Sequence, residues 1–176
     1  MTYLKPTRWW MYPFRFIARC QKASIQDQYE KYGIRLFDLR IQFKDLNPSF
    51  AHGIMSYKGD VYRVIEYLNS RTERVYVRLI LENCKDWDTE LFRILCHKLE
   101  EENPNISFFG GYRKKDWKKL YDFKYPEPRL IQLISSMTGS KWDGWCPWLY
   151  AKLNNKKNIK TLQSDKWYLL DFINIQ

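Results

Sequence analysis

The chain has 176 residues, of which 45% are hydrophobic and 28% charged, a composition typical of globular proteins that excludes a disordered chain. Its mean hydropathy of −0.60, without an apolar leader or an apolar run near the ~20 residues of a membrane span, predicts a cytoplasmic protein and excludes an integral membrane protein. The net charge of +10 and the aromatic content of 18% favour a polyanionic partner: an anionic membrane surface, a phosphorylated ligand or a nucleic acid.

Strand and helix patterns alternate along the chain. Short β-rich apolar runs predict six strands, at residues 34–43, 49–52, 74–82, 106–110, 130–135 and 167–173. Apolar residues at helical spacing and helix-start signals predict helices at residues 24–32, 60–70, 89–102, 114–121 and 147–154.

This alternation predicts an α/β fold built from parallel βαβ units, in one domain over residues 1–176. The expected architecture is a small or distorted (β/α) TIM-like barrel, because regular barrels need about 200 residues or more. An open doubly wound sheet is the alternative.

Ionisable side chains lie near the ends of four predicted strands. They are Asp38 and Arg40, His52, Glu82 and Asp171. In parallel βα folds the functional site forms at the carboxyl ends of the strands, so these groups are the candidate site. Asp38 and Arg40 are two residues apart and therefore point to the same side of their strand.

Two sequence segments in the first half of the chain are similar to a known protein family. The segments ARCQKASIQDQYEKYGIRLFDLRI and FAHGIMSYKGDVYRVIEYLN, within residues 18–69, resemble the X-domain of phosphatidylinositol-specific phospholipase C. VRLILENCKD is similar to the next strand of that family, and WYLLDFIN to its closing strand. The resemblance implies a distorted TIM barrel of the phospholipase-C-like phosphodiesterase type, which cleaves phosphodiesters through a cyclic inositol phosphate.

The resemblance also implies roles for the candidate residues. Arg40 matches the arginine that metal-independent members use against the phosphate, and Asp38 matches the carboxylate on the family's second strand. Glu82 matches a calcium ligand of the eukaryotic members; because its partner carboxylates are missing here, it is expected to accept an ion pair or a hydroxyl instead and, with Asp38, to orient Arg40 and His52. His52 matches the general acid that protonates the leaving alcohol. Asp171 resembles the aspartate that supports the general base.

No metal ion or other cofactor is expected. An arginine at position 40 stands where calcium-dependent members have a carboxylate. The four cysteines, Cys20, Cys84, Cys96 and Cys146, form no CxxC pair, which argues against a zinc site and against disulfides.

One element of the family pattern is missing. The family has a general-base histidine on its first strand, which is expected here near residues 9–17, but no histidine precedes His52. His97, the other histidine, belongs to a solvated helix face between Arg93 and Glu101. Asp171 would be a poor substitute because Arg40 is expected to lower its pKa. The expected enzyme is therefore impaired, and a binding module on an enzyme scaffold is the alternative.

Aromatic and basic residues occur together in two later segments, 110–123 and 140–157. Trp145 and Trp148 in the second are candidates for a membrane or ligand surface. The expected partner is a phosphodiester such as a phospholipid headgroup, with peripheral attachment to an anionic membrane as an extension. Nucleic-acid binding is the third and least favoured function, since no RNA-binding motif is visible.

Overall fold

The computed structural model describes residues 4–14, 20–53, 55–82, 86–112, 119–122, 131–135, 147–162 and 167–174. Its helical elements are η1 (Trp9–Met11), α2 (Ile25–Glu30), α3 (Val61–Asn69), α4 (Asp86–Glu102) and α6 (Pro147–Lys160). Its strands are β1 (Leu36–Lys44), β2 (Asn47–His52), β3 (Met55–Ser56), β4 (Val75–Leu81), β5 (Ile106–Tyr112), β6 (Lys119–Asp122), β7 (Ile131–Ser135) and β8 (Trp167–Leu169).

The strands form one mixed sheet in the order β3-β2-β1-β4-β5-β6-β7-β8. The pairs β1–β4, β4–β5 and β7–β8 are parallel, whereas β1–β2, β2–β3, β5–β6 and β6–β7 are antiparallel. The predicted α/β class is confirmed, but the prediction of parallel strands throughout is wrong. Among the described strands β3 and β8 are the two ends of the sheet, so the sheet does not close into the predicted barrel.

The β1–β2 connection explains the departure from an all-parallel sheet. Only Asp45 and Leu46 join the two strands, with φ of 50° and 64°, which is the left-handed geometry of a tight hairpin. A parallel pair would need a crossover of a dozen residues or more. A connection this short therefore allows β1 and β2 to pair only in the antiparallel direction.

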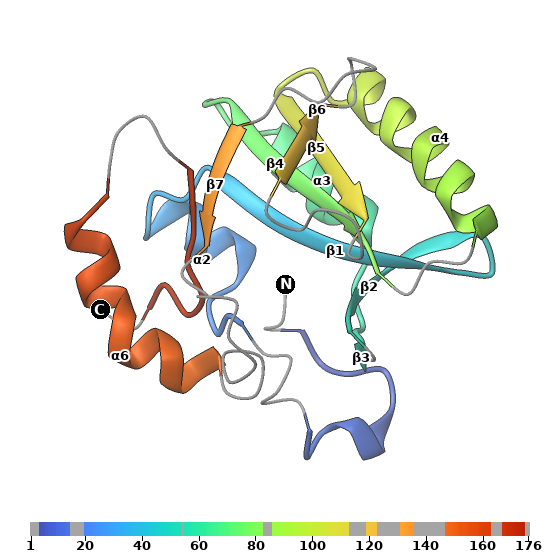
Figure 1. Ribbon diagram of the computed structural model, residues 1–176. Helices are drawn as coiled ribbons and strands as arrows, with labels where there is room; N and C mark the ends of the chain where they lie inside the picture. The colour runs from blue at the N-terminus through green and yellow to red at the C-terminus, as the bar shows by residue number, and fades with distance from the viewer. Residues whose placement is uncertain are drawn as a thin grey trace.

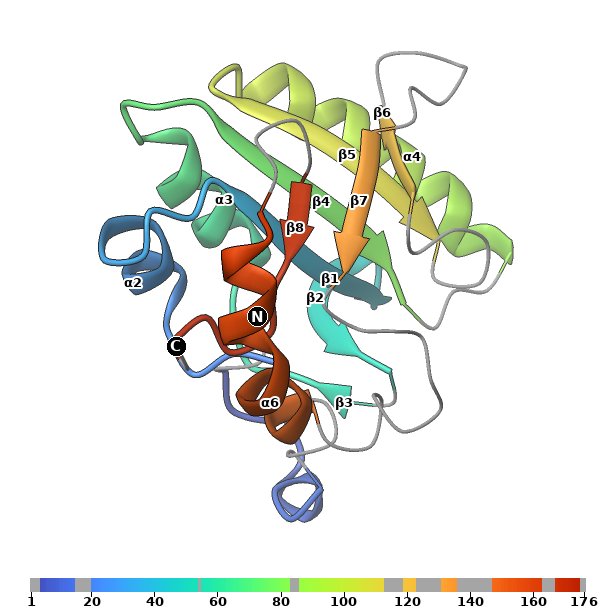
Figure 2. The same cartoon turned by 60° about the vertical axis from the view of Figure 1, so that its left-hand side comes forward.

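The two faces of the central strands differ in chemistry because side chains alternate along a strand. On β1, Phe37, Leu39 and Ile41 point into the apolar core, together with Val77 and Leu79 of β4. The helices α3 and α4 cover this face (Figure 1), while α6 lies on the other side of the sheet (Figure 2). The alternate residues of the same strands are free to build a polar site on the opposite face.

Several local predictions are confirmed by their capping geometry. The Ser24 side chain accepts a hydrogen bond from the Asp27 backbone N–H at the start of α2, and Gly33 ends this segment with φ of 64°. The Asp60 carboxylate likewise accepts from two backbone N–H groups at the start of α3. α4 and α6 also form, and α6 begins at Pro147 as predicted.

Other local predictions are wrong. The helix expected over 114–121 is contradicted at residues 119–121, which belong to β6 and pair with both β5 and β7. The first strand expected near 9–17 is contradicted at residues 9–14, where η1 and turns stand; Pro13 supplies no N–H for a strand ladder. The strand expected over 167–173 ends at Leu169, and Phe172 has a left-handed φ of 49° that no strand contains. Residues 15–17 and 114–118 lie outside the described residues.

Candidate active site

Arg40 is held between two carboxylates on the polar face of the sheet. Its Nε donates to Oδ2 of Asp38 at 3.0 Å, and its Nη1 donates to Oε1 of Glu82 at 3.0 Å. Asp38 lies two residues away on β1, and Glu82 follows β4, the parallel neighbour whose register pairs Arg40 with Ile80. The alternation that predicted a shared face for Asp38 and Arg40 is confirmed, and the parallel register brings Glu82 to the same face.

The carboxylates fix the charge of this arginine. Burial lowers the pKa of Arg40, but the anionic neighbours Asp38 and Glu82 more than offset this, so the pKa is raised. Burial likewise raises the pKa of Asp38, but the guanidinium groups of Arg40 and Arg78 outweigh it and the pKa is lowered. Asp38 and Arg40 therefore both carry their charge at neutral pH, and the Arg40 side chain is 22% exposed.

His52, at the end of β2, lies at the same site. The backbone N–H of the next residue, Gly53, donates to Oε2 of Glu82 at 3.3 Å, which ties the end of β2 to β4. The Nδ1 atom of His52 lies 3.8 Å from the Cys20 thiol. The structure thus brings the four sequence-predicted residues Asp38, Arg40, His52 and Glu82 into one cluster.

Asp171 is brought to this cluster by a backbone clamp and not by a strand. The Gln21 amide donates to the Leu170 carbonyl at 2.7 Å, and its oxygen accepts from the Ile173 N–H at 3.1 Å. The Phe172 N–H donates to the Cys20 carbonyl at 2.6 Å. Segments about 150 residues apart in sequence are therefore bound together, and Cys20 lies beside Asp171.

The electrostatics of Asp171 differ from the sequence-based expectation. Burial raises its pKa to about 6, against the lowering effects of the hydrogen bond from the Cys20 thiol and of the Arg40 charge. The expectation that Arg40 would lower this pKa is wrong because the loss of hydration outweighs the attraction. A carboxylate with this pKa is largely ionised at neutral pH and yet basic enough to take a proton.

Two residues of the cluster had escaped sequence reasoning. The Cys20 thiol contacts both His52 and Asp171, and burial raises its pKa well above the usual range, with the negative charge of Asp171 adding to the effect. Arg78 on β4 is fully buried with Nη1 3.5 Å from Oδ1 of Asp38. Arg78 carried a usable signal, because a charged residue inside the apolar run RVYVRLILE requires a buried partner; Cys20 carried none.

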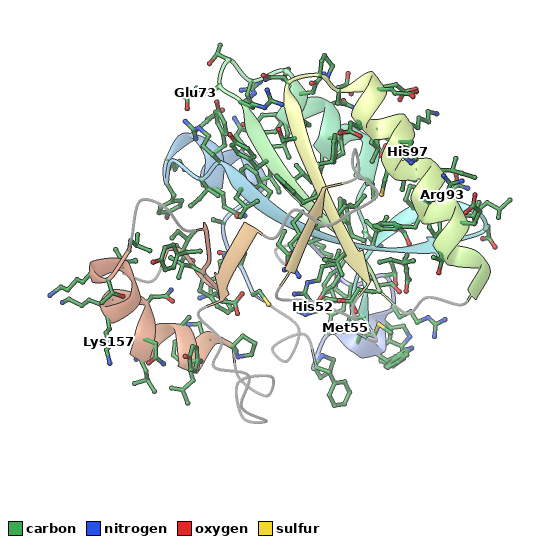
Figure 3. The ribbon with its side chains drawn as sticks, turned by 45° about the horizontal axis from the view of Figure 1, so that its top comes forward. His52, Met55, Glu73, Arg93, His97 and Lys157 are labelled. Atoms are coloured by element: carbon green, nitrogen blue, oxygen red, sulfur yellow. The ribbon has the colours of Figure 1, made fainter. Side chains whose placement is uncertain are left out.

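Of the remaining candidates, the structure places His97 on α4 and Trp148 on α6. His97 is exposed on α4, on the face that the sequence predicted, and Figure 3 shows it and Arg93 far from His52. Trp148, at the start of α6, is 38% exposed with the Lys152 ammonium 5.2 Å from its ring centre. Trp145, Cys84 and Cys146 lie outside the described residues.

The described residues contain no group of three His, Cys, Asp or Glu side chains arranged to hold a metal ion. Asp38 and Glu82 both direct an oxygen at Arg40, so the guanidinium occupies the space between the two carboxylates. Within the described helices, none combines the length and the apolar character that a membrane span requires.

Comparison with known proteins identifies the fold class. No family model and no curated protein matches the sequence. Among solved structures, the chain matches the phosphatidylinositol-specific phospholipase C of Listeria monocytogenes, with a TM-score of 0.63 and 16% sequence identity over 97% of this chain and 85% of that chain. The chain therefore has the fold of a phospholipase-C-like phosphodiesterase, as the resemblance implied.

Proposed function

We propose that the chain is a phosphodiesterase that cleaves a phosphodiester, such as that of a phospholipid headgroup, with Arg40 binding the phosphate. The single observation that carries the proposal is the cluster that brings the cation Arg40 together with His52 and Asp171, two groups able to transfer protons, within a phospholipase-C-like fold. Asp38 and Glu82 orient the guanidinium through Nε and Nη1. Within the described part of the chain its Nη2 makes no hydrogen bond, which leaves donors for a phosphate oxygen.

The proposed reaction uses one base and one acid. Asp171 accepts the proton of the attacking hydroxyl, whose oxygen forms a bond to phosphorus. The bond from phosphorus to the leaving oxygen breaks, and the protonated imidazole of His52 donates its proton to that oxygen. Arg40 neutralises the charge that develops on the non-bridging oxygens.

Asp171 can act as the general base in place of the histidine that is missing from the first strand. A base with a pKa of about 6 works close to neutral pH, which an aspartate at its usual value of about 4 does not. This supports catalysis over the alternative of a binding module without activity. The Cys20 thiol is not proposed as a nucleophile, because its raised pKa keeps it protonated.

The test is turnover of inositol phospholipids and of simple phosphodiesters, with and without EDTA, by four variants. Arg40→Ala and Asp171→Asn should each lose about a hundredfold or more in turnover. Arg93→Ala and His97→Ala, both on the exposed face of α4 (Figure 3), are the matched controls and should retain full activity. Phosphate binding without turnover in the unmodified protein would support the binding module and refute the enzyme.

A further inference from the structure

An unusual concentration of exposed aromatic side chains surrounds η1. Trp9, Trp10, Tyr12 and Phe14 are 83%, 44%, 39% and 54% exposed. Large side chains left in water at four of six consecutive positions expose apolar area that a soluble surface seldom tolerates. We name residues 8–14 the aromatic knob.

Backbone hydrogen bonds and one buried side chain hold the knob in place. Backbone N–H groups of Met11, Tyr12 and Phe14 donate in succession to the carbonyls three residues earlier, at 3.1 Å each. The Met11 side chain is 6% exposed and belongs to the main apolar core. Met11 therefore anchors the knob to the core, while the aromatic side chains face solvent. Because the backbone of the knob is already folded, its insertion costs less conformational entropy than the insertion of an unfolded segment would.

Three exposed basic side chains accompany the knob, one at its first residue and two on the adjoining backbone. Lys5, Arg8 and Lys58 are all exposed, and the Lys58 N–H donates to the Lys5 carbonyl at 2.8 Å, which holds the two lysines side by side. The Arg8 guanidinium lies 6.0 Å from the centre of the Trp10 ring. Asp60 is the nearest acidic residue in sequence to Lys58, and its carboxylate accepts backbone hydrogen bonds as the N-cap of α3.

The knob lies at the same end of the molecule as the candidate active site. The Thr7 N–H donates to the Ser56 carbonyl at 3.0 Å, and Pro6 bridges to Tyr57. Ser56 belongs to β3, whose other residue, Met55, pairs with His52. Figure 1 shows the knob projecting beyond β3, and Figure 3 shows Met55 next to His52.

We propose that the aromatic knob inserts into the headgroup region of an anionic lipid bilayer, with Lys5, Arg8 and Lys58 contacting the lipid phosphates. Tryptophan and tyrosine favour this region because it accommodates an apolar ring and a polar edge together. A convex tip with a cationic base fits a soft anionic surface, whereas a protein partner would need a matching concave socket. Insertion would bring headgroup phosphodiesters to the end of the molecule that holds His52.

The experiment is co-sedimentation of the full chain with vesicles of phosphatidylcholine or of equal parts phosphatidylcholine and phosphatidylserine. The unmodified protein should bind the mixed vesicles and lose that binding at high salt. The double variant Trp9→Ala/Trp10→Ala should bind about tenfold more weakly or worse. Lys5→Glu/Lys58→Glu should remove the preference for phosphatidylserine.

Two controls make the test specific. Tyr62→Ala removes a 44% exposed aromatic side chain on α3 and should leave binding unchanged. Leu149→Ala/Leu153→Ala removes two exposed leucines on α6, the competing apolar surface, and should also leave it unchanged. No binding by the unmodified protein, binding that survives Trp9→Ala/Trp10→Ala, or binding lost only in the α6 variant would overturn the proposal. These vesicles contain no inositol lipid and need no turnover, so failure of the proposed activity would not affect the result.

Discussion

Glu82 and Arg40 join two parallel strands through one charged hydrogen bond of 3.0 Å. The Glu82 side chain is completely buried, and its second oxygen accepts from the Gly53 N–H. One carboxylate thus links β1, the end of β2 and β4, and the Arg40 guanidinium compensates its negative charge. Removing one partner of a buried ion pair is strongly destabilising, because the other charge is left buried without compensation.

Glu82→Gln is expected to lower the free energy of unfolding by about 3 kcal/mol, because Arg40 loses a buried counter-charge. Urea unfolding measures this value. Glu73→Gln is the matched control: Glu73 pairs with Arg35 at 2.7 Å, but its side chain is 63% exposed, so the loss should stay under about 1 kcal/mol. Equal losses in the two variants would contradict the assignment of Glu82 as a buried structural pair.

Asp171→Asn is expected to change stability in a pH-dependent way. The folded protein holds the Asp171 proton up to about pH 6, whereas the unfolded chain releases it near its usual pKa of about 4. The contribution of this group to stability is therefore complete at acid pH and is lost as the pH rises through 6. Relative to the unmodified protein, the Asn variant should gain about 2–3 kcal/mol between pH 4 and pH 8 in urea titrations. A difference that does not vary with pH would contradict the raised pKa.

The central part of the site was accessible from the sequence. The spacing of Asp38 and Arg40 dictates a shared face, and parallel pairing of two apolar runs brings Glu82 to that face. The short antiparallel strands β3 and β6 could not be predicted from the sequence. β3 and β6 contain two and four residues, too short for a periodic pattern, and they form because neighbouring strands supply the pairing.

The rest of the site depends on contacts that no local pattern records. Cys20 meets Asp171 because Gln21 binds the backbone on both sides of it, at a sequence separation of about 150 residues. Long-range contacts of this kind produce no periodicity. The pKa of Asp171 departs from the sequence-based expectation for a related reason: the charge of Arg40 can be read from the sequence, but the degree of burial cannot.

His52→Ala is expected to reduce turnover according to the leaving group. An acid that protonates the leaving oxygen matters most when that oxygen is strongly basic. The loss should be about a hundredfold or more for an alkyl phosphodiester and small for a nitrophenyl phosphodiester. Steady-state rates on the two substrates, with His97→Ala as the control, measure the difference. Equal losses on both would exclude His52 as the general acid.

Cys20 is expected to tune the proton affinity of Asp171. Its thiol donates a hydrogen bond that lowers the pKa of Asp171 and so opposes the dominant effect of burial. Cys20→Ala removes the donor and should raise that pKa above 6, whereas Cys20→Ser keeps a hydroxyl donor and should leave it nearer to the original value. Direct NMR titration of the Asp171 carboxyl carbon measures the pKa without relying on turnover. If Asp171 is the base, the acid limb of the pH–rate profile should shift to higher pH in the Ala variant, by the same amount as the NMR pKa. Coinciding NMR titrations of the Ala variant and the unmodified protein would show that the thiol does not control this carboxylate. A limb that stays in place while the NMR pKa moves would show that another group is the base.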